Sequence, residues 1–130
     1  MRLTLLTLSL LAGLTILTAC GGAMAPTPTP VSNGPKISLT TNPDPPKSGD
    51  VELVVMVNDP NGEPIPDADV FIFADHTEMK GMSMNGRATA QGGGRYTTTA
   101  SFAHSGKWKV TVQVKKAPLG LVEEFHLELQ

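Results

Sequence analysis

Strict alternation between apolar and polar residues is the pattern that most constrains what this chain can fold into. From Lys107 to Lys115 the sequence reads KWKVTVQVK, in which Trp108 and three valines occupy every second position. Successive side chains of a β-strand point to opposite faces of the sheet. The pattern is therefore typical of a strand in an antiparallel sheet with one face buried and the other in water.

Similar alternation recurs along the chain after Lys36. Further strands are predicted over 37–41, 51–57, 68–75, 95–102 and 121–129, with a weaker one over 87–91. The segments between them are rich in turn formers, as in Asp59-Pro60-Asn61-Gly62. No helical periodicity follows Cys20. Six or seven short strands in about 95 residues predict an all-β fold, an immunoglobulin-like antiparallel β-sandwich.

The first 19 residues have the features of an export signal. Arg2 gives a positive start, and Leu3 to Ala19 form an apolar run diluted with Thr and Ser. This run of about 17 residues is at the lower limit for spanning a bilayer, and an uncleaved anchor helix is the alternative. The sequence Leu17-Thr18-Ala19-Cys20-Gly21 resembles the lipobox of bacterial lipoproteins. That resemblance implies removal of residues 1–19 and a diacylated Cys20, carrying palmitate, as the new first residue.

The single cysteine and the segment after it determine the expected organisation. Because Cys20 is the only cysteine, no intrachain disulfide is possible and packing alone must hold the domain together. Residues 21–35 read GGAMAPTPTPVSNGP, a composition that favours extended polyproline II geometry. We therefore expect a lipidated cysteine and Pro/Thr-rich tether over 20–35 and one domain over 36–130. The expected location is the cell envelope, lipid-anchored and extracytoplasmic, in the periplasm or on the outer face of the membrane.

Charge and residue types exclude two broad functional classes. The formal net charge is -2 and the chain has no basic stripe, so nucleic-acid binding is not expected. No Ser-His-Asp order and no paired carboxylates around a cleft are indicated. A lipid-bearing Cys20 cannot serve as a nucleophile. The chain is therefore not expected to be an enzyme, and the lipid anchor is its predicted contact with the membrane.

One segment, Asp75–Gly86, does not fit the strand pattern and carries an unusual density of sulfur. Met79, Met82 and Met84 fall within six positions, among polar residues typical of a surface loop. Soft thioether sulfur favours Cu(I) over harder ions. The segment therefore predicts a copper site, whereas the alternative is that these flexible side chains fill gaps in a core or lid.

Two histidines are candidate partners for these sulfurs, because imidazole also suits copper. His76 adjoins the cluster, although a histidine at a strand end can equally cap a turn. His104 lies in a turn between two predicted strands, and it reaches the same end of the domain only if 87–91 is a strand. His126, between Glu124 and Glu128 in the alternation, is expected to be a solvated surface residue.

Several short motifs link the chain to a known family. They are Gly49-Asp50, Gly62-Glu63-Pro64 with Ala68 and Val70, the methionine segment 79–84, Gly94-Arg95-Tyr96, and the run from Phe102 through His104 and Gly106 to Trp108. Over about Gly49 to Val114 these resemble the YtkA-like domain, which is related in pattern to the FixH proteins. The resemblance implies an immunoglobulin-like sandwich and a role in metal handling, with copper as the metal, around the envelope. It implies no catalytic activity. Family members often carry Met where His104 stands, and this departure keeps a ligand compatible with copper.

These observations leave two functional hypotheses open. The first is a membrane-anchored lipoprotein that binds copper, as Cu(I), through His76, Met79, Met82, Met84 and His104 for metal handling or delivery. Its expected partner is an envelope copper protein or an oxidase-assembly protein. The second is a metal-free immunoglobulin-like module that presents its loops to an envelope protein and needs none of those ligands. Titration of the soluble domain with Cu(I) distinguishes the two.

Overall fold

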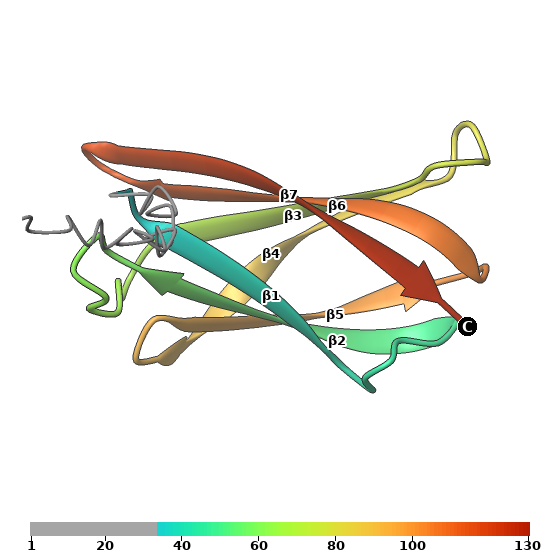
Figure 1. Cartoon of the computed structure of the whole chain (residues 1–130), viewed down its shortest axis with the longest axis horizontal. Coiled ribbons are helices and arrows are strands. Elements are labelled where there is room, and N and C mark those ends of the chain that lie inside the picture. Colours follow the sequence, from blue (N-terminus) through green and yellow to red (C-terminus); the bar gives the residue numbers. More distant parts are fainter. Residues whose placement is uncertain (1–33) are drawn as a thin grey trace, which may run out of the picture. The chain divides into compact units, whose positions relative to one another are not determined.

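The computed structural model describes residues 34–130, and this part of the chain folds entirely into β-structure (Figure 1). The strands are β1 (Lys36–Asn42), β2 (Gly49–Asn58), β3 (Asp69–His76), β4 (Ser83–Gly92), β5 (Arg95–Phe102), β6 (Gly106–Lys116) and β7 (Leu119–Leu129). The predicted all-β fold is confirmed, including the weak strand over 87–91. Between residues 34 and 130 no helix is long and apolar enough to cross a membrane. The predicted export signal, Cys20 and most of the tether lie outside the described residues.

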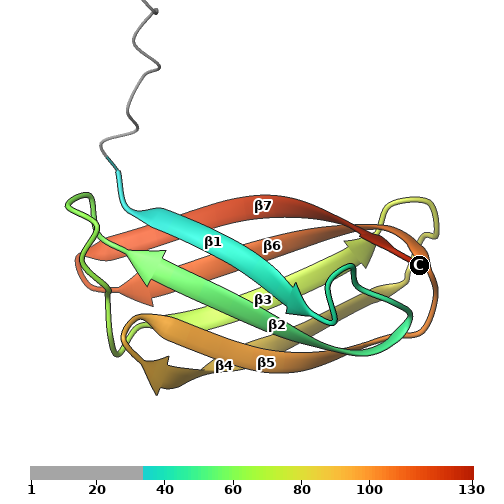
Figure 2. The ribbon, with the colours of Figure 1, turned by 60° about the horizontal axis from the view of Figure 1, so that its bottom comes forward.

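The strands form an antiparallel sheet that nearly closes on itself, in the order β1-β2-β5-β4-β3-β6-β7 (Figure 2). Strand β4 makes this curvature possible because it pairs first with β3 and then with β5. It thereby joins the half formed by β1, β2 and β5 to the half formed by β3, β6 and β7. At the C-terminus, the Gln130 amide donates to the Pro46 carbonyl over 3.0 Å, and the Ser48 amide donates to the Gln130 carbonyl over 2.9 Å.

The core consists of the inward positions of the strands, and β2 and β6 contribute most of it. Their fully buried side chains are Val51, Leu53, Val55 and Val57 on β2 and Trp108, Val110, Val112 and Val114 on β6. Burying one such side chain stabilises the folded state by about 1.5–3 kcal/mol. The predicted inward face of the segment 107–115 is confirmed, and its alternating polar residues lie on the outside.

The β2–β3 connection is attached to the sheet by a buried tyrosine. The Tyr96 hydroxyl donates to the Ile65 carbonyl over 2.7 Å and accepts from the Ala68 amide over 2.9 Å. Beside it, Gly94 has a positive φ of 73°, and a Cβ there would lie 2.7 Å from the Val57 carbonyl oxygen. These contacts fix the end of the domain at which β1 begins.

The expectation that Asp75–Gly86 is a loop is wrong for half of its length. Strand β3 continues to His76 and β4 begins at Ser83, so the connection spans only residues 77–82. Ala74 pairs with Met84, and Ile72 pairs with Gly86. The apolar alternation of β4 was hidden in the sequence because Gly86, which has no side chain, occupies one of its inward positions.

Candidate metal site at the distal end

Two loops that carry candidate ligands lie together at the end of the domain opposite the start of β1 (Figure 1). We call this end, formed by the β3–β4 loop (77–82) and the β5–β6 loop (103–105), the distal end. The amide of Thr77 and its hydroxyl both donate to the Lys107 carbonyl, over 2.9 and 3.0 Å. The predicted strand parity is therefore confirmed, and His104 does not lie at the other end beside Pro66 or Gly93.

His76, the last residue of β3, connects the two distal loops. Its side chain is buried, with 6% of its surface exposed. Its Nδ1 accepts from the amides of Glu78 and Met79, each over 3.2 Å, and its Nε2 lies 3.1 Å from the Ser105 carbonyl. Backbone amides only donate and a carbonyl only accepts, so these contacts require a neutral ring with its hydrogen on Nε2.

The surroundings of His76 are built to hold this ring. The Trp108 ring lies edge-on to it with 5.0 Å between centroids, and Phe102 packs against Trp108 at 4.9 Å. A Cβ at Gly106 would lie 3.0 Å from His76 Nε2, and Gly106 has a positive φ of 113°. Glycine at this position therefore allows the close approach of β6 to the imidazole. In the sequence, Ser105-Gly106 indicated only a turn before the strand of Trp108, and neither residue was expected to contact His76.

Both ring nitrogens of His76 are thus used within the protein. Binding a metal through either nitrogen would break at least one of these hydrogen bonds. Metal ligation by His76 stays a prediction, whereas its turn-capping role, the alternative considered from sequence, is present in the structure.

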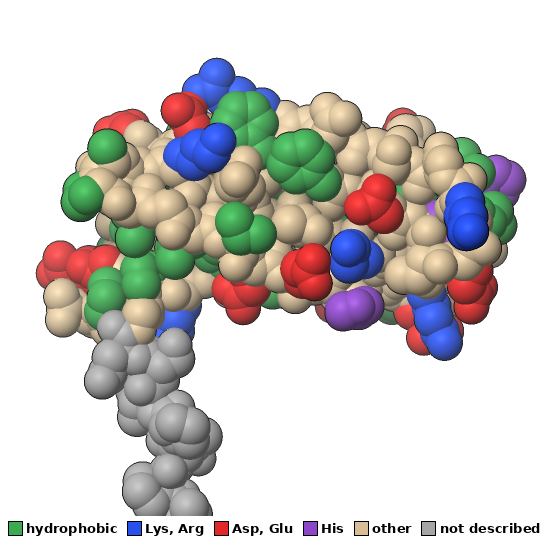
Figure 3. Space-filling view, turned by 90° about the horizontal axis from the view of Figure 1, so that it is seen from above, with side chains coloured by type: hydrophobic (Ala, Val, Ile, Leu, Met, Phe, Trp, Pro, Cys, Tyr) green, Lys and Arg blue, Asp and Glu red, His purple; other side chains and the backbone are tan. Residues whose placement is uncertain are grey.

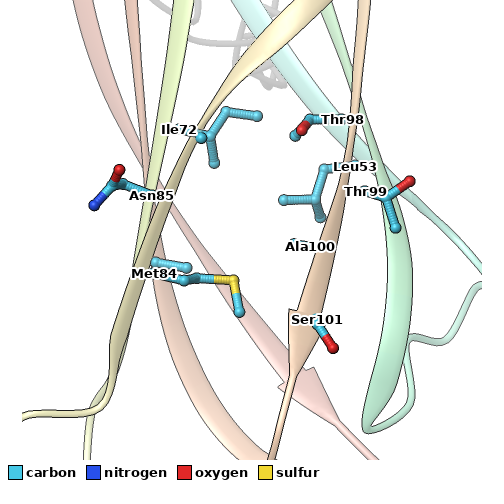
Figure 4. Close-up of a pocket in the computed structure, with 10 residues that line it drawn as sticks. Leu53, Ile72, Met84, Asn85, Thr98, Thr99, Ala100 and Ser101 are labelled. Atoms are coloured by element: carbon cyan, nitrogen blue, oxygen red, sulfur yellow. The ribbon is translucent and has the colours of Figure 1, made fainter.

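The three methionines do not share one environment. Met79 lies in the β3–β4 loop with 41% of its surface exposed. Met82 and Met84 are half-buried and pack against the core, and Figure 4 shows the Met84 sulfur pointing into the space between β4 and β5. The expectation that all three lie in an exposed loop is therefore wrong for Met82 and Met84. Their inward orientation follows from the strand alternation that continues from β4.

His104 is exposed at the tip of the β5–β6 loop. Its backbone carbonyl accepts a hydrogen bond from Trp108 Nε1 over 3.1 Å, which fixes the loop backbone. Among the described residues, no hydrogen bond involves its imidazole. Figure 3 shows histidine and hydrophobic side chains grouped at the distal end. Met79 and His104 are thus the two solvent-accessible soft or borderline ligands at this end.

The ligand chemistry of the distal end is that of thioether and imidazole. Within residues 34–130, no three His, Cys, Asp or Glu side chains are grouped closely enough to hold a metal ion. Thioethers are not among those ligand types. Thioether sulfur and imidazole are a combination of ligands that suits Cu(I).

A comparison with family models agrees with this organisation. A model described as YtkA-like matches residues 30–113. The matched range includes β1 to β5, most of β6 and both distal loops. No curated protein matches the chain.

Proposed function

Because the chain belongs to the YtkA-like family, we propose that it is a membrane-anchored extracytoplasmic lipoprotein that binds Cu(I) at its distal end. The observation that carries the proposal is the presence of two accessible ligands, Met79 and His104, on loops that His76 connects through hydrogen bonds. A thioether and an imidazole on adjoining, fixed loops are ligands that copper accepts.

Met82 and Met84 complete the proposed ligand set. Both are half-buried and pack against the core beside the distal loops. Methionine has three rotatable bonds and changes rotamer easily. Rotamer changes at these side chains bring additional thioethers to a copper ion already held by Met79 and His104. The neutral sulfur ligands favour Cu(I) over Zn(II).

The proposed role is metal handling or delivery, without catalysis. The lipobox-like sequence ending at Cys20 supports a lipid anchor, and the segment 21–35 supports a spacer between that anchor and the domain. Since the distal end lies opposite the start of β1, its two loops face away from the point where the tether joins the domain. That placement suits exchange with an envelope copper protein or an oxidase-assembly protein.

The test is a Cu(I) titration against a competing chelator, using the chain from residue 20 onward with Cys20→Ser. We expect Cu(I) binding that exceeds Zn(II) binding, and a loss of at least tenfold in Cu(I) affinity in the double variant Met79→Leu/His104→Ala. Met56→Leu is the matched control. Met56 is half-buried on the face of β2 opposite its core residues, so its replacement should leave the Cu(I) affinity unchanged. Preference for Zn(II), or equal affinity in the double variant, would contradict the proposal.

The packing of Met82 and Met84 against the core favours the second candidate function. In that case the methionines serve structure, and the domain is a metal-free interaction module of the envelope. It then retains no copper in the same titration.

A further inference from the structure

Strands β4 and β5 pair over only part of their length. Their register runs through Thr89–Thr97 and Ala90–Tyr96 to Gly92–Arg95, with a shift between Ala90 and Gly92. In β4, residues 83–88 precede this stretch and pair with β3 alone. In β5, residues 98–102 follow it and pair with β2 alone. Within the described part of the chain, two strand edges therefore face the same opening without a partner strand.

An apolar pocket of about 210 Å³ lies in this opening (Figure 4). Leu53, Ile72 and Ala74 contribute its wall from β2 and β3, and Met84 lines it from β4. The pocket exists because Gly86 supplies no side chain at an inward position of β4. This volume exceeds the roughly 150 Å³ of an apolar cavity that binds benzene, so the pocket has room for one large apolar side chain.

The free edge of β4 carries one charged residue, Arg87, which forms an ion pair with Asp69 of β3, whereas the free edge of β5 carries none. Ser83 to Gly86 read SMNG, and Thr98 to Phe102 read TTASF, without Lys, Arg, Asp, Glu or Pro. Natural proteins protect exposed strand edges with charges, prolines or bulges. The edge strand β7, in contrast, carries three glutamates among its residues 119–129. The free edge of β5 is thus an unprotected edge next to an apolar pocket.

We propose that this opening is a docking site for an extended, uncharged segment of a partner protein. The segment adds as a strand to the free edge of β5 and inserts one apolar side chain into the pocket beside Gly86. Main-chain hydrogen bonds then provide affinity, and the pocket selects the inserted side chain. A charged side chain is excluded because the pocket offers no group to pair with it. The inference does not rest on copper binding, although Met84 lines the pocket and is also a proposed copper ligand.

Gly86→Val is the variant that tests the pocket. A Cβ at Gly86 meets only Thr98 Oγ1, at 3.7 Å, and the φ of Gly86 is not in the left-handed region. The valine therefore fills the pocket without backbone strain. Ala100→Val fills the same space from β5 if Gly86→Val does not fold. Gly120→Val on β7, where a Cβ has nothing within 4 Å, is the matched control.

The probes are acetylated and amidated hexapeptides of sequence Thr-Val-Thr-X-Thr-Val, with Val, Leu, Met or Phe at X, titrated into the ¹⁵N-labelled chain with Cys20→Ser. We expect at least one to shift the NMR signals of residues 83–88 and 98–102 and to slow amide exchange in β5. Peptide affinity should fall at least tenfold in the Gly86→Val protein and stay unchanged in the Gly120→Val protein. With the unchanged protein, it should also fall at least tenfold when X is Lys or when alternate peptide amides are N-methylated.

Four outcomes would overturn the proposal. One is the absence of binding by every peptide at millimolar concentration. Another is equal affinity in the pocket-filling variants, and a third is undiminished binding of the N-methylated peptide, which would exclude strand addition. The fourth is self-association in sedimentation experiments that Gly86→Val abolishes, which would make a second copy of the chain the occupant.

Discussion

Replacing His76 with leucine removes three hydrogen bonds that hold the distal loops together. Each such bond contributes about 1 kcal/mol net to stability. The amides of Glu78 and Met79 lie in an exposed loop, where water replaces the lost acceptor, so the cost for them is at the low end. Loss of the edge-on contact with Trp108 adds about 0.5–1.5 kcal/mol, which the apolar leucine partly offsets. We therefore expect the free energy of unfolding to fall by about 2–3 kcal/mol.

Urea unfolding of the chain with Cys20→Ser measures this change. His126→Leu is the matched control, because His126 is exposed on β7 and a surface substitution usually changes stability by no more than about 0.5 kcal/mol. Amide exchange at Glu78 and Met79 should also become faster in His76→Leu. If His76→Leu costs no more than His126→Leu, the three contacts contribute nothing and the bridging role is refuted.

A second measurement on His76 shows whether it only supports the distal loops or itself binds the metal. The ring hydrogen of His76 is expected on Nε2, where ¹⁵N NMR of the imidazole detects it directly. Addition of Cu(I) should leave this tautomer unchanged if Met79 and His104 hold the metal. A loss of the Nε2 hydrogen, or a large shift of Nδ1 on copper addition, would show that His76 itself becomes a ligand.

Three further predictions concern the methionines, the connection before β6 and the anchor. Replacing Met79, Met82 and Met84 together with leucine should lower Cu(I) affinity while changing stability by less than about 1.5 kcal/mol, and a larger loss with affinity intact would make them core residues only. Gly106→Ala should cost about 1–3 kcal/mol in urea unfolding, because of its positive φ and the nearby imidazole. In the full-length chain, Cys20→Ser should abolish lipid labelling and leave an unprocessed precursor, and normal processing would exclude the lipoprotein assignment.

The strands were predictable because their signal is local. Each valine of 107–115 alternates with a polar residue, and burial of one face of a sheet requires that alternation wherever the strand lies. Even the weak strand over 87–91 was found, and it alone placed His104 at the correct end of the domain. By contrast, β4 pairs with β3 up to Ala88 and with β5 from Thr89, and no local pattern in the sequence contains this change of neighbour.

The candidate site was less predictable because its chemistry depends on contacts between distant segments. A histidine before a methionine cluster reads equally as a ligand or as a cap, and only the approach of the Ser105 carbonyl to Nε2 shows that the ring is already occupied. Likewise, Gly86 interrupts an apolar alternation in the sequence, yet in the sheet it is the missing side chain that opens the pocket between β4 and β5. Met84 borders that pocket and is also a proposed copper ligand, so filling the pocket from Gly86 and measuring Cu(I) affinity separates the two roles of β4. Unchanged affinity in Gly86→Val would show that copper is held on the loop side, by Met79 and His104, without the sulfur that lines the pocket.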